Sequence, residues 1–330
     1  MNIQDITKIK RRTVLTGAVA SLLAPPLLAS PWPSRPVRII VPFAAGGPGD
    51  FVARMVAIPL SRVLGQSVIV ENKPGAGGNL GAQYVVDSEA NGYTLLLNTV
   101  GMHAVNPLLF PGARLQPRRD LVAIGIAAMV PNVLVVHPTK LHVNTLADLV
   151  ELGRQKPDNL TYATYGAGSS PHIYGALLQK AAGFSAVAVP YKGSAPASTD
   201  VMAGQVDFLF DSMTTCVGKI QGGTLKGLAI TSEARSPLLP DVPTLKEAGY
   251  PALDLKFWLS LQVSAKTPPE LVEVLRQAMA RSVTDPQYTQ GLIARGAEPF
   301  QIDPAELQAY VNRDADRWEA LARSIGIKPE

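Results

Sequence analysis

One segment, residues 37–54, constrains the fold more than any other part of the chain. Residues 37–41 (VRIIV) are rich in β-branched side chains and predict a short buried strand, which Pro42 ends because proline has no N–H for a neighbouring strand. A glycine loop at 46–49 follows, and apolar residues at helical spacing then predict a helix that Asp50 caps. This order of elements forms a seat for a small anion, because backbone N–H groups and the positive end of the helix dipole face the loop.

This glycine loop does not match the known nucleotide-binding motifs. Residues 46–49 (GGPG) lack the G-x-G-x-x-G spacing of a dinucleotide fingerprint and the Gly-Lys-Ser/Thr of a P-loop. Loops of this kind are also common as plain turns between strand and helix. By itself the loop therefore indicates a small-anion site and does not specify the ligand.

The order of strand, polar loop and helix recurs along the chain. In the first third, strands are predicted at 67–71 and 93–98, and each runs into a loop rich in Gly, Asn or Thr. In the middle third, strands at 160–164, 186–190 and 206–210 run into loops rich in Ser, Thr and Gly. Because open α/β sheets bind ligands at the C-terminal ends of their strands, these loops predict a ligand cleft between two lobes.

Length and composition favour two domains. The chain has 330 residues, of which 47% are hydrophobic, so it can bury a large core. We predict an α/β fold in which lobe 1 comprises residues 31–129 and 231–330, and lobe 2 comprises residues 130–230. A long strand is expected at 255–263, and the helical tail after it has no glycine-rich loops. We therefore predict that this tail packs on lobe 1 and completes it.

Residues 1–30 are predicted to be a secretory signal peptide that is removed near residue 30. A basic cluster at 8–12 precedes an uncharged apolar run at 14–28, and Ala29-Ser30 offers a cleavage site. The apolar run is shorter than the about 20 residues that a membrane-spanning helix needs. The pair Arg11-Arg12 fits twin-arginine export and also occurs in ordinary Sec signals, so the export route stays open.

The positive charge of the chain belongs mostly to this N-terminal segment. The whole chain has a formal net charge of +4, and residues 1–30 contain four basic residues and one acidic residue. The mature chain is therefore close to neutral. A nucleic-acid partner is not expected, because the basic surface that such binding requires is missing.

The sequence contains no clear catalytic or metal-binding motif. Cys216 is the only cysteine, and the four histidines show neither an H-E-x-x-H motif nor a close pair, so no metal and no cofactor are expected. Ser169 and Ser170 lie near His172, which makes a secreted α/β hydrolase the alternative to a binding protein. However, the G-x-S-x-G elbow is absent and a helix cap explains the serines, so we predict a protein that is not an enzyme.

Several longer motifs follow one another along the chain. They are IVPFAAGG at 40–47, VENKPGAGGN at 70–79, GYTLLL at 92–97, HAVNP at 103–107, PYKGSAP at 190–196, GQVD at 204–207 and RSPLLPDVPT at 235–244. In these motifs, and over about Arg35 to Ile327, the chain resembles the periplasmic substrate-binding receptors of the tripartite tricarboxylate transporter family, also called TctC or Bug receptors.

The resemblance implies a function and a set of binding residues. It implies a periplasmic monomer whose two α/β lobes close like a Venus flytrap on a small carboxylated solute. The solute would then pass to membrane transporter subunits or to a sensor. Transferred to this sequence, the ligand-binding positions are the strand-end residues Phe43, Ala44, Ala45, Gly46, Gly47, Asn98, Thr99, His103, Ser169, Ser170, His172, Tyr191, Lys192, Gly193, Asp211 and Ser212. Asp211 is expected to meet a cationic or hydroxyl group at the far end of the solute.

Two positions depart from the pattern of this family. Met102 stands where a threonine often follows the glycine, so a hydroxyl contact is missing and a less polar ligand is favoured. Tyr165 stands before the loop of lobe 2, where small residues are usual, and is expected to narrow the site. The identity of the carboxylate therefore stays open.

Overall fold

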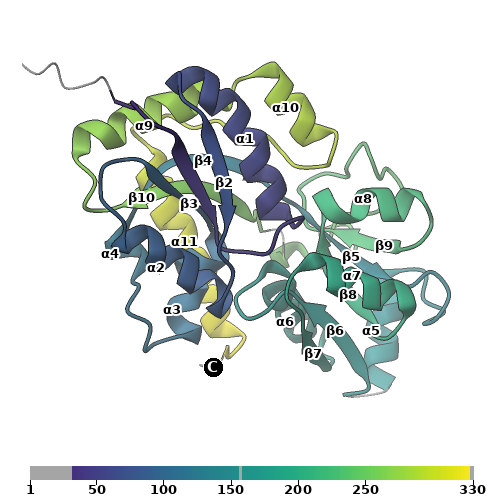
Figure 1. Cartoon of the computed structure of the whole chain (residues 1–330). Helices are drawn as coiled ribbons and strands as arrows, with labels where there is room; N and C mark the ends of the chain where they lie inside the picture. The colour runs from purple at the N-terminus through teal and green to yellow at the C-terminus, as the bar shows by residue number, and fades with distance from the viewer. Residues whose placement is uncertain (1–31, 156–157, 254, 328–330) are drawn as a thin grey trace, which may run out of the picture.

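Two five-stranded mixed sheets, one in each of two lobes, make up the molecule (Figure 1). The structure is a computed structural model that describes residues 32–155, 158–253 and 255–327. The predicted signal peptide lies outside the described residues. No helix in the part of the chain that the structure describes is long and apolar enough to span a membrane.

The sheet of lobe 1 has the strand order β2-β1-β3-β10-β4. Strand β1 (Val37–Val41) pairs in parallel with β2 (Val68–Asn72) and with β3 (Thr94–Thr99). Strand β10 (Trp258–Ser264) runs antiparallel between β3 and β4 (Leu121–Met129). Residues from the last third of the chain thus lie in the middle of the first sheet.

Helices cover both faces of this sheet. On one face lie α1 (Pro48–Leu64), α9 (Pro269–Ser282) and α10 (Pro286–Ile293), whose apolar side chains form one cluster with β1 and β3. The other face carries α2 (Asn79–Asp87) and α11 (Leu307–Ser324). Shorter elements complete the lobe: η1 (Ala76–Gly78), η2 (Gly101–Val105), α3 (Asn106–Leu109), α4 (Pro117–Asp120) and η3 (Pro251–Leu253).

The prediction that Asp50 caps α1 is wrong. Helix α1 begins at Pro48, and Gly47 is its N-cap, because proline fits the first turn where its missing N–H costs nothing. Asp50 lies within the first turn. Its carboxylate accepts hydrogen bonds from the backbone N–H of Gly46 (3.0 Å) and from Arg54 Nε (3.0 Å), so it fixes the glycine loop from inside the helix.

The sheet of lobe 2 has the strand order β7-β6-β8-β5-β9. Strand β6 (Leu160–Thr164) pairs in parallel with β7 (Ala186–Pro190) and β8 (Phe208–Ser212). Strand β5 (Asn132–Val136) runs antiparallel to β8 and to β9 (Lys226–Ile230). The helices of this lobe are α5 (Leu146–Gln155), α6 (Ser170–Ala182), α7 (Ser194–Ala203) and α8 (Met213–Gln221).

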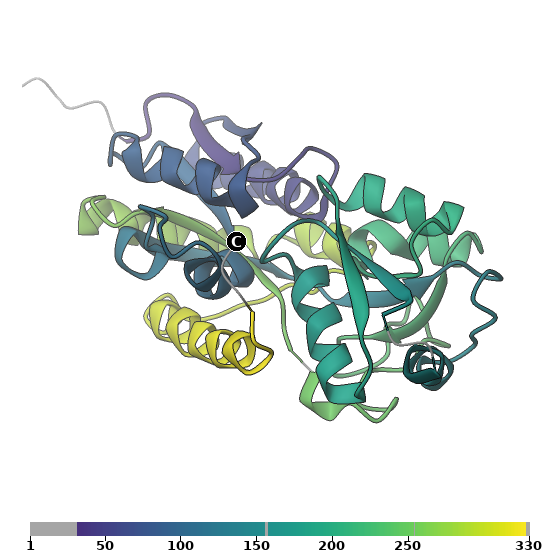
Figure 2. The same ribbon diagram turned by 90° about the horizontal axis from the view of Figure 1, so that it is seen from below.

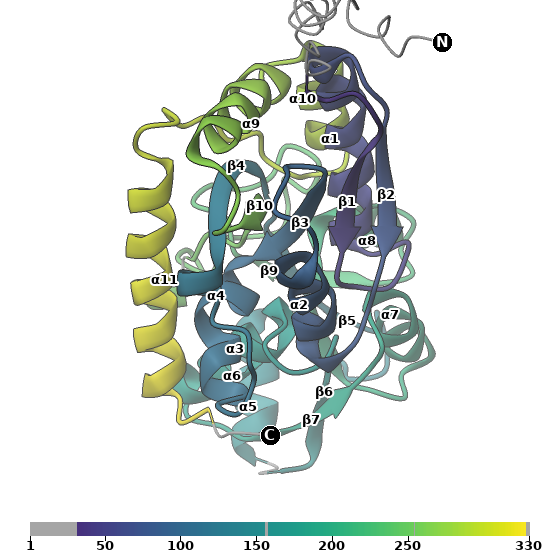
Figure 3. The same ribbon diagram turned by 60° about the vertical axis from the view of Figure 1, so that its left-hand side comes forward.

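Helix α11, drawn in yellow, runs along one side of the molecule (Figures 2 and 3). On this side a shared apolar core joins the two lobes. The ring of Tyr174 in α6 lies edge-on to Trp318 in α11, with 5.9 Å between centroids, and Phe257 packs on the same indole at 5.7 Å. The hydroxyl of Tyr174 donates to the carbonyl of Leu255 in the returning chain (2.5 Å). Helix α6 is therefore anchored to lobe 1 through its second turn, and its N-terminus lies at the loop that follows β6.

Candidate functional site

The strand-end loops of the two lobes face and touch each other. A methyl group placed on Gly193, after β7, would lie 3.9 Å from the side chain of Ala44, after β1. The contact between Gly101, after β3, and Gly168, after β6, is much closer: a methyl group on Gly101 would lie 2.2 Å from the carbonyl oxygen of Gly168. The structure therefore brings together loops of lobe 1 and lobe 2 that contain predicted binding residues.

A second interlobe contact involves Asn106, which lies in the HAVNP motif but was not predicted to bind a ligand. Asn106 Nδ2 donates to the carbonyl of Gly77 (2.9 Å) and to Asn79 Oδ1 (2.9 Å), which fixes the second glycine-rich loop. Gly168 of lobe 2 packs against the same amide, and Asn106 Oδ1 is buried without a hydrogen-bond partner in the described residues. Glycine at positions 77 and 168 allows the loops to come close together, but the sequence does not show which loops meet there.

Four predicted site residues are N-caps of helices that begin at these loops. Gly47 caps α1, Ser169 caps α6, Gly193 caps α7 and Ser212 caps α8. At none of these four ends does the cap side chain accept a hydrogen bond from the helix. Backbone N–H groups of this kind, together with the helix dipole, favour an anion in front of the helix. The end of α1 comes from lobe 1, and those of α6 and α7 come from lobe 2. At α8 the backbone N–H groups of Ser212 and Met213 already donate to the Tyr165 hydroxyl (3.2 Å) and to the carbonyl of Pro131 (2.9 Å).

The first loop of lobe 1 is held in place by its neighbours and stays accessible. Residues 44–46 are exposed, while the carbonyl of Phe43 accepts a hydrogen bond from Asn72 Nδ2 (3.1 Å). Burial by itself would raise the pKa of Asp50, but hydrogen bonds from Arg54 and from the backbone of Gly46 outweigh it and hold that pKa below its ordinary value. Asp50 therefore stays charged and keeps the loop in one shape.

The serines and histidine of the lobe 2 loop do not form a nucleophile–base pair. Ser169 Oγ donates to the carbonyl of Gly166 (2.6 Å), and Ser170 Oγ donates to Asn132 Oδ1 (2.9 Å). His172 Nδ1 accepts from the backbone N–H of Gly168 (3.2 Å), and burial lowers the pKa of this imidazole. In the described residues neither hydroxyl is hydrogen-bonded to His172, so the arrangement that activates a serine is missing.

Asn98, Thr99 and His103 lie at the end of β3 and in the turn that follows it, where they form a buried polar cluster. All three side chains are buried, and Asn98 Nδ2 lies 2.9 Å from Gln262 Oε1 and 3.3 Å from His103 Nδ1. Thr99 Oγ1 accepts from the backbone N–H of Met102 (3.1 Å). Burial, with a smaller effect of the Arg118 charge, lowers the pKa of His103 to about 4. These groups shape the turn after β3 and present little surface to a solute.

The remaining predicted residues differ in exposure. Lys192 is exposed, and Tyr191 beside it donates its hydroxyl to Asp200 Oδ2 (2.7 Å). Burial and the Asp200 carboxylate together raise the pKa of Tyr191 to about 12. Asp211 is fully buried, so its carboxylate has no exposed surface. Met102 is buried in the core against Gly78, so its side chain is not available to contact a solute directly.

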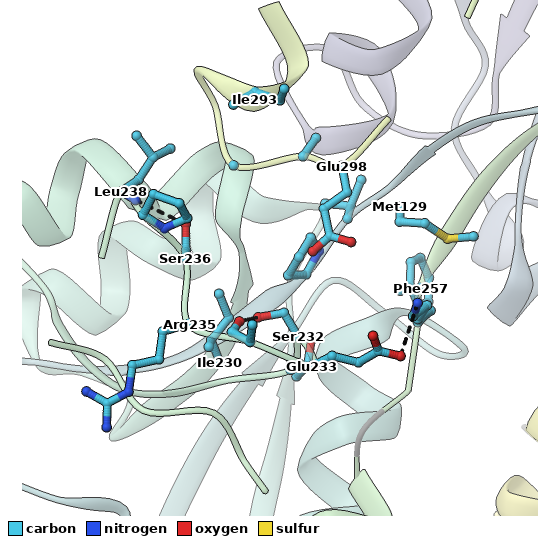
Figure 4. Close-up of a pocket in the computed structure, with 18 of the residues that line it drawn as sticks. Met129, Ile230, Ser232, Glu233, Arg235, Ser236, Leu238, Phe257, Ile293 and Glu298 are labelled. Atoms are coloured by element: carbon cyan, nitrogen blue, oxygen red, sulfur yellow. Dashed lines mark hydrogen bonds and ion pairs between the residues drawn. The ribbon is translucent and has the colours of Figure 1, made fainter. Parts of the chain in front are cut away.

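A separate cavity of about 420 Å³ lies where the chain crosses between the lobes (Figure 4). Its walls include Met129, Ile230 and Phe257, and an ion pair between Lys256 Nζ and Glu233 (3.2 Å) lies beside it. None of the predicted binding residues lines this cavity. Because its walls come from both lobes, its shape depends on the angle between them.

Comparison with known proteins shows the family of this chain. A family model described as "Tripartite tricarboxylate transporter family receptor" matches residues 52–327. Protein BugT of Bordetella pertussis is 34% identical over 307 residues, which cover 93% of this chain and 94% of that protein.

Two solved structures from Rhodopseudomonas palustris have the same fold. Rpa4515, determined with adipate, is 36% identical with a TM-score of 0.85 and covers 91% of this chain and 100% of its own. MatC with bound malate is 31% identical with a TM-score of 0.82 and covers 88% of this chain and 99% of its own. The chain belongs to the receptor family of the tripartite tricarboxylate transporters.

Proposed function

We propose that this protein is a receptor that captures a small dicarboxylate between its lobes and does not change it chemically. One observation carries the proposal: the N-termini of α1, α6 and α7, which have no capping side chains, begin at the facing loops of the two lobes. Each end supplies backbone N–H donors and partial positive charge, so carboxylate groups can be bound without a metal ion. Adipate and malate, the ligands of two similar proteins, each carry two carboxylates.

The binding residues that we propose fall into two groups. Residues 43–47 of lobe 1 and residues 169, 170, 172 and 191–193 of lobe 2 offer backbone N–H groups and polar side chains at the facing loops. Asn98, Thr99, His103, Asp211 and Ser212 support these loops from below, since all five are buried. Closure of the lobes removes water from the solute, which strengthens each of the direct hydrogen bonds.

The setting that we propose follows from the family and from the N-terminal segment. The receptor acts in the periplasm as a monomer, after removal of residues 1–30. It delivers its solute to the membrane subunits of a tripartite transporter or to a sensor. Its family is one of transporter receptors, which supports this order of events.

Thermal melting of the mature protein against a panel of carboxylates tests the proposed function. A solute at 100 times its dissociation constant stabilises the folded state by about 2.7 kcal/mol, which corresponds to a rise on the order of 5 °C for a chain of this size. We expect dicarboxylates to give such a rise and to be recovered unchanged from the denatured protein. Ester turnover that Ser170→Ala abolishes would instead establish the hydrolase.

Replacement of Gly47 by valine is expected to weaken solute binding at least tenfold without affecting the fold. Gly47 has an ordinary extended backbone, and a methyl group there would be 3.6 Å from its nearest neighbour, the carbonyl oxygen of Ala44. The valine would occupy the space where a carboxylate meets the N-terminus of α1. Calorimetric titration of Gly47→Val measures the effect, with Gly112→Val as a control in open space. Equal affinity of Gly47→Val and the parent would place the solute elsewhere.

A further inference from the structure

A single buried carboxylate connects the loops of lobe 2 that contain the proposed site. Asp211, at the end of β8, is fully buried. Its oxygens bind hydroxyl groups and one ammonium group. The partners are Tyr165, whose hydroxyl donates to Oδ1, Ser194 at 3.1 Å and Thr215 at 2.6 Å from Oδ1, Ser198 at 2.5 Å from Oδ2, and the Lys219 ammonium at 3.7 Å from Oδ2.

Three of these partners lie at three different helix starts. Tyr165 is in the loop that leads to α6, Ser194 is the first residue of α7, and Thr215 lies in the first turn of α8. The hydroxyl of Tyr165 also accepts the backbone N–H of Ser212, the N-cap of α8 (3.2 Å). Removal of the Asp211 carboxylate would therefore release three N-termini from one another.

We propose that Asp211 is a positioning residue for solute binding, which fixes the N-termini of α6, α7 and α8 at the spacing that one carboxylate requires. The proposal rests on the function proposed above and replaces the expected contact between Asp211 and the far end of the solute. Direct contact would require a free acceptor at the surface, whereas both oxygens of Asp211 already accept hydrogen bonds and the side chain has no exposed area. Preorganised donors bind an anion better than mobile ones, because they lose less freedom on binding.

Lys219 has a distinct role in this network. The negative charge of Asp211 lies under the helix ends that attract the solute, so by itself it would oppose a bound carboxylate. The ammonium of Lys219, 3.7 Å away, offsets this charge. Replacement of Lys219 by methionine is therefore expected to weaken binding of a dicarboxylate more than binding of a monocarboxylate, and added salt should reduce the difference.

Substitutions that remove single hydroxyl groups test the proposal. Ser198→Ala and Thr215→Val each remove one donor to Asp211, and Ser198 cannot contact a solute because it is fully buried. We expect each to raise the dissociation constant for adipate or malate about tenfold, and Asp211→Asn to raise it at least 100-fold. Thr215→Ser keeps the hydroxyl and should bind like the parent. The dissociation constants of the variants and the parent are measured by calorimetric titration, at a temperature where circular dichroism shows that each variant is folded.

The control is Ser282→Ala in lobe 1, where a fully buried serine donates within its own helix to Ala278 (2.7 Å). This variant should bind like the parent. If the parent binds carboxylates and Ser198→Ala and Thr215→Val bind them equally well, the positioning role of Asp211 is wrong while the receptor function stands. If the parent binds no carboxylate, both proposals are wrong.

Discussion

Gly101→Ala is expected to weaken solute binding by about 10- to 100-fold, although it adds a single methyl group. In this structure that methyl group would lie 2.2 Å from the carbonyl oxygen of Gly168 in the opposite lobe. A backbone oxygen cannot turn aside as a flexible side chain can, so the lobes must stay further apart. Overpacking of this kind costs about 1–3 kcal/mol, and each 1.4 kcal/mol is a factor of ten in affinity.

The same substitution should leave the fold of each lobe intact. Gly101 begins a helical turn and does not need a left-handed backbone, so alanine fits once the lobes separate. The measurement is calorimetric titration together with small-angle scattering, which should show a solute-bound protein that is more open than the parent. Gly218→Ala, in lobe 2 and in open space, serves as the control. Full affinity and full closure in Gly101→Ala would contradict the contact between these loops.

Acid is expected to destabilise the protein through His103, by about 3 kcal/mol between pH 7 and pH 4. Burial lowers the pKa of this imidazole from 6.5 to about 4. Below pH 6.5 the unfolded chain therefore binds a proton that the folded chain does not. The stability that this group contributes is present above pH 6.5 and is lost progressively as the pH falls to about 4.

Urea unfolding of the parent and of His103→Gln at several pH values measures this effect. The difference in unfolding free energy between the two should decrease as the pH falls from 7 to 4, because only the parent contains the buried imidazole. His142→Asn, at an exposed position, controls for the loss of a histidine elsewhere. A difference that does not change with pH would mean that His103 is protonated in the folded state or is open to water.

The sequence predicts the local order of elements well and their partners less well. Strand β1, its glycine loop and α1 follow from side-chain types within one short segment. The strand predicted at 255–263 is present as β10, which begins three residues later, at Trp258. Its place between β3 and β4 was not predictable, because the pairing of Leu261 with Leu97 joins residues that are far apart in the chain. Such pairing depends on how whole layers pack.

For the candidate site too, the sequence predicts local features better than contacts between distant parts of the chain. Ser169 is the N-cap of α6, as the sequence predicts, whereas Gly47 takes the place predicted for Asp50 at α1. His103 and Asp211 have side chains suited to ligand contact, and the sequence does not show that both are buried. Burial decides whether a polar group binds the solute or supports the group that does. It depends on contacts from other parts of the chain.

Calorimetric titration with adipate, malate and citrate tests the central claim most directly. Protein that lacks residues 1–30 is first unfolded, dialysed and refolded, so that a solute carried over from the host is removed. We expect saturable binding of at least one of these carboxylates at one site per chain, with recovery of the solute unchanged. The absence of binding at millimolar concentrations of all three, by a protein shown to be refolded, would contradict a receptor for small carboxylates of this kind.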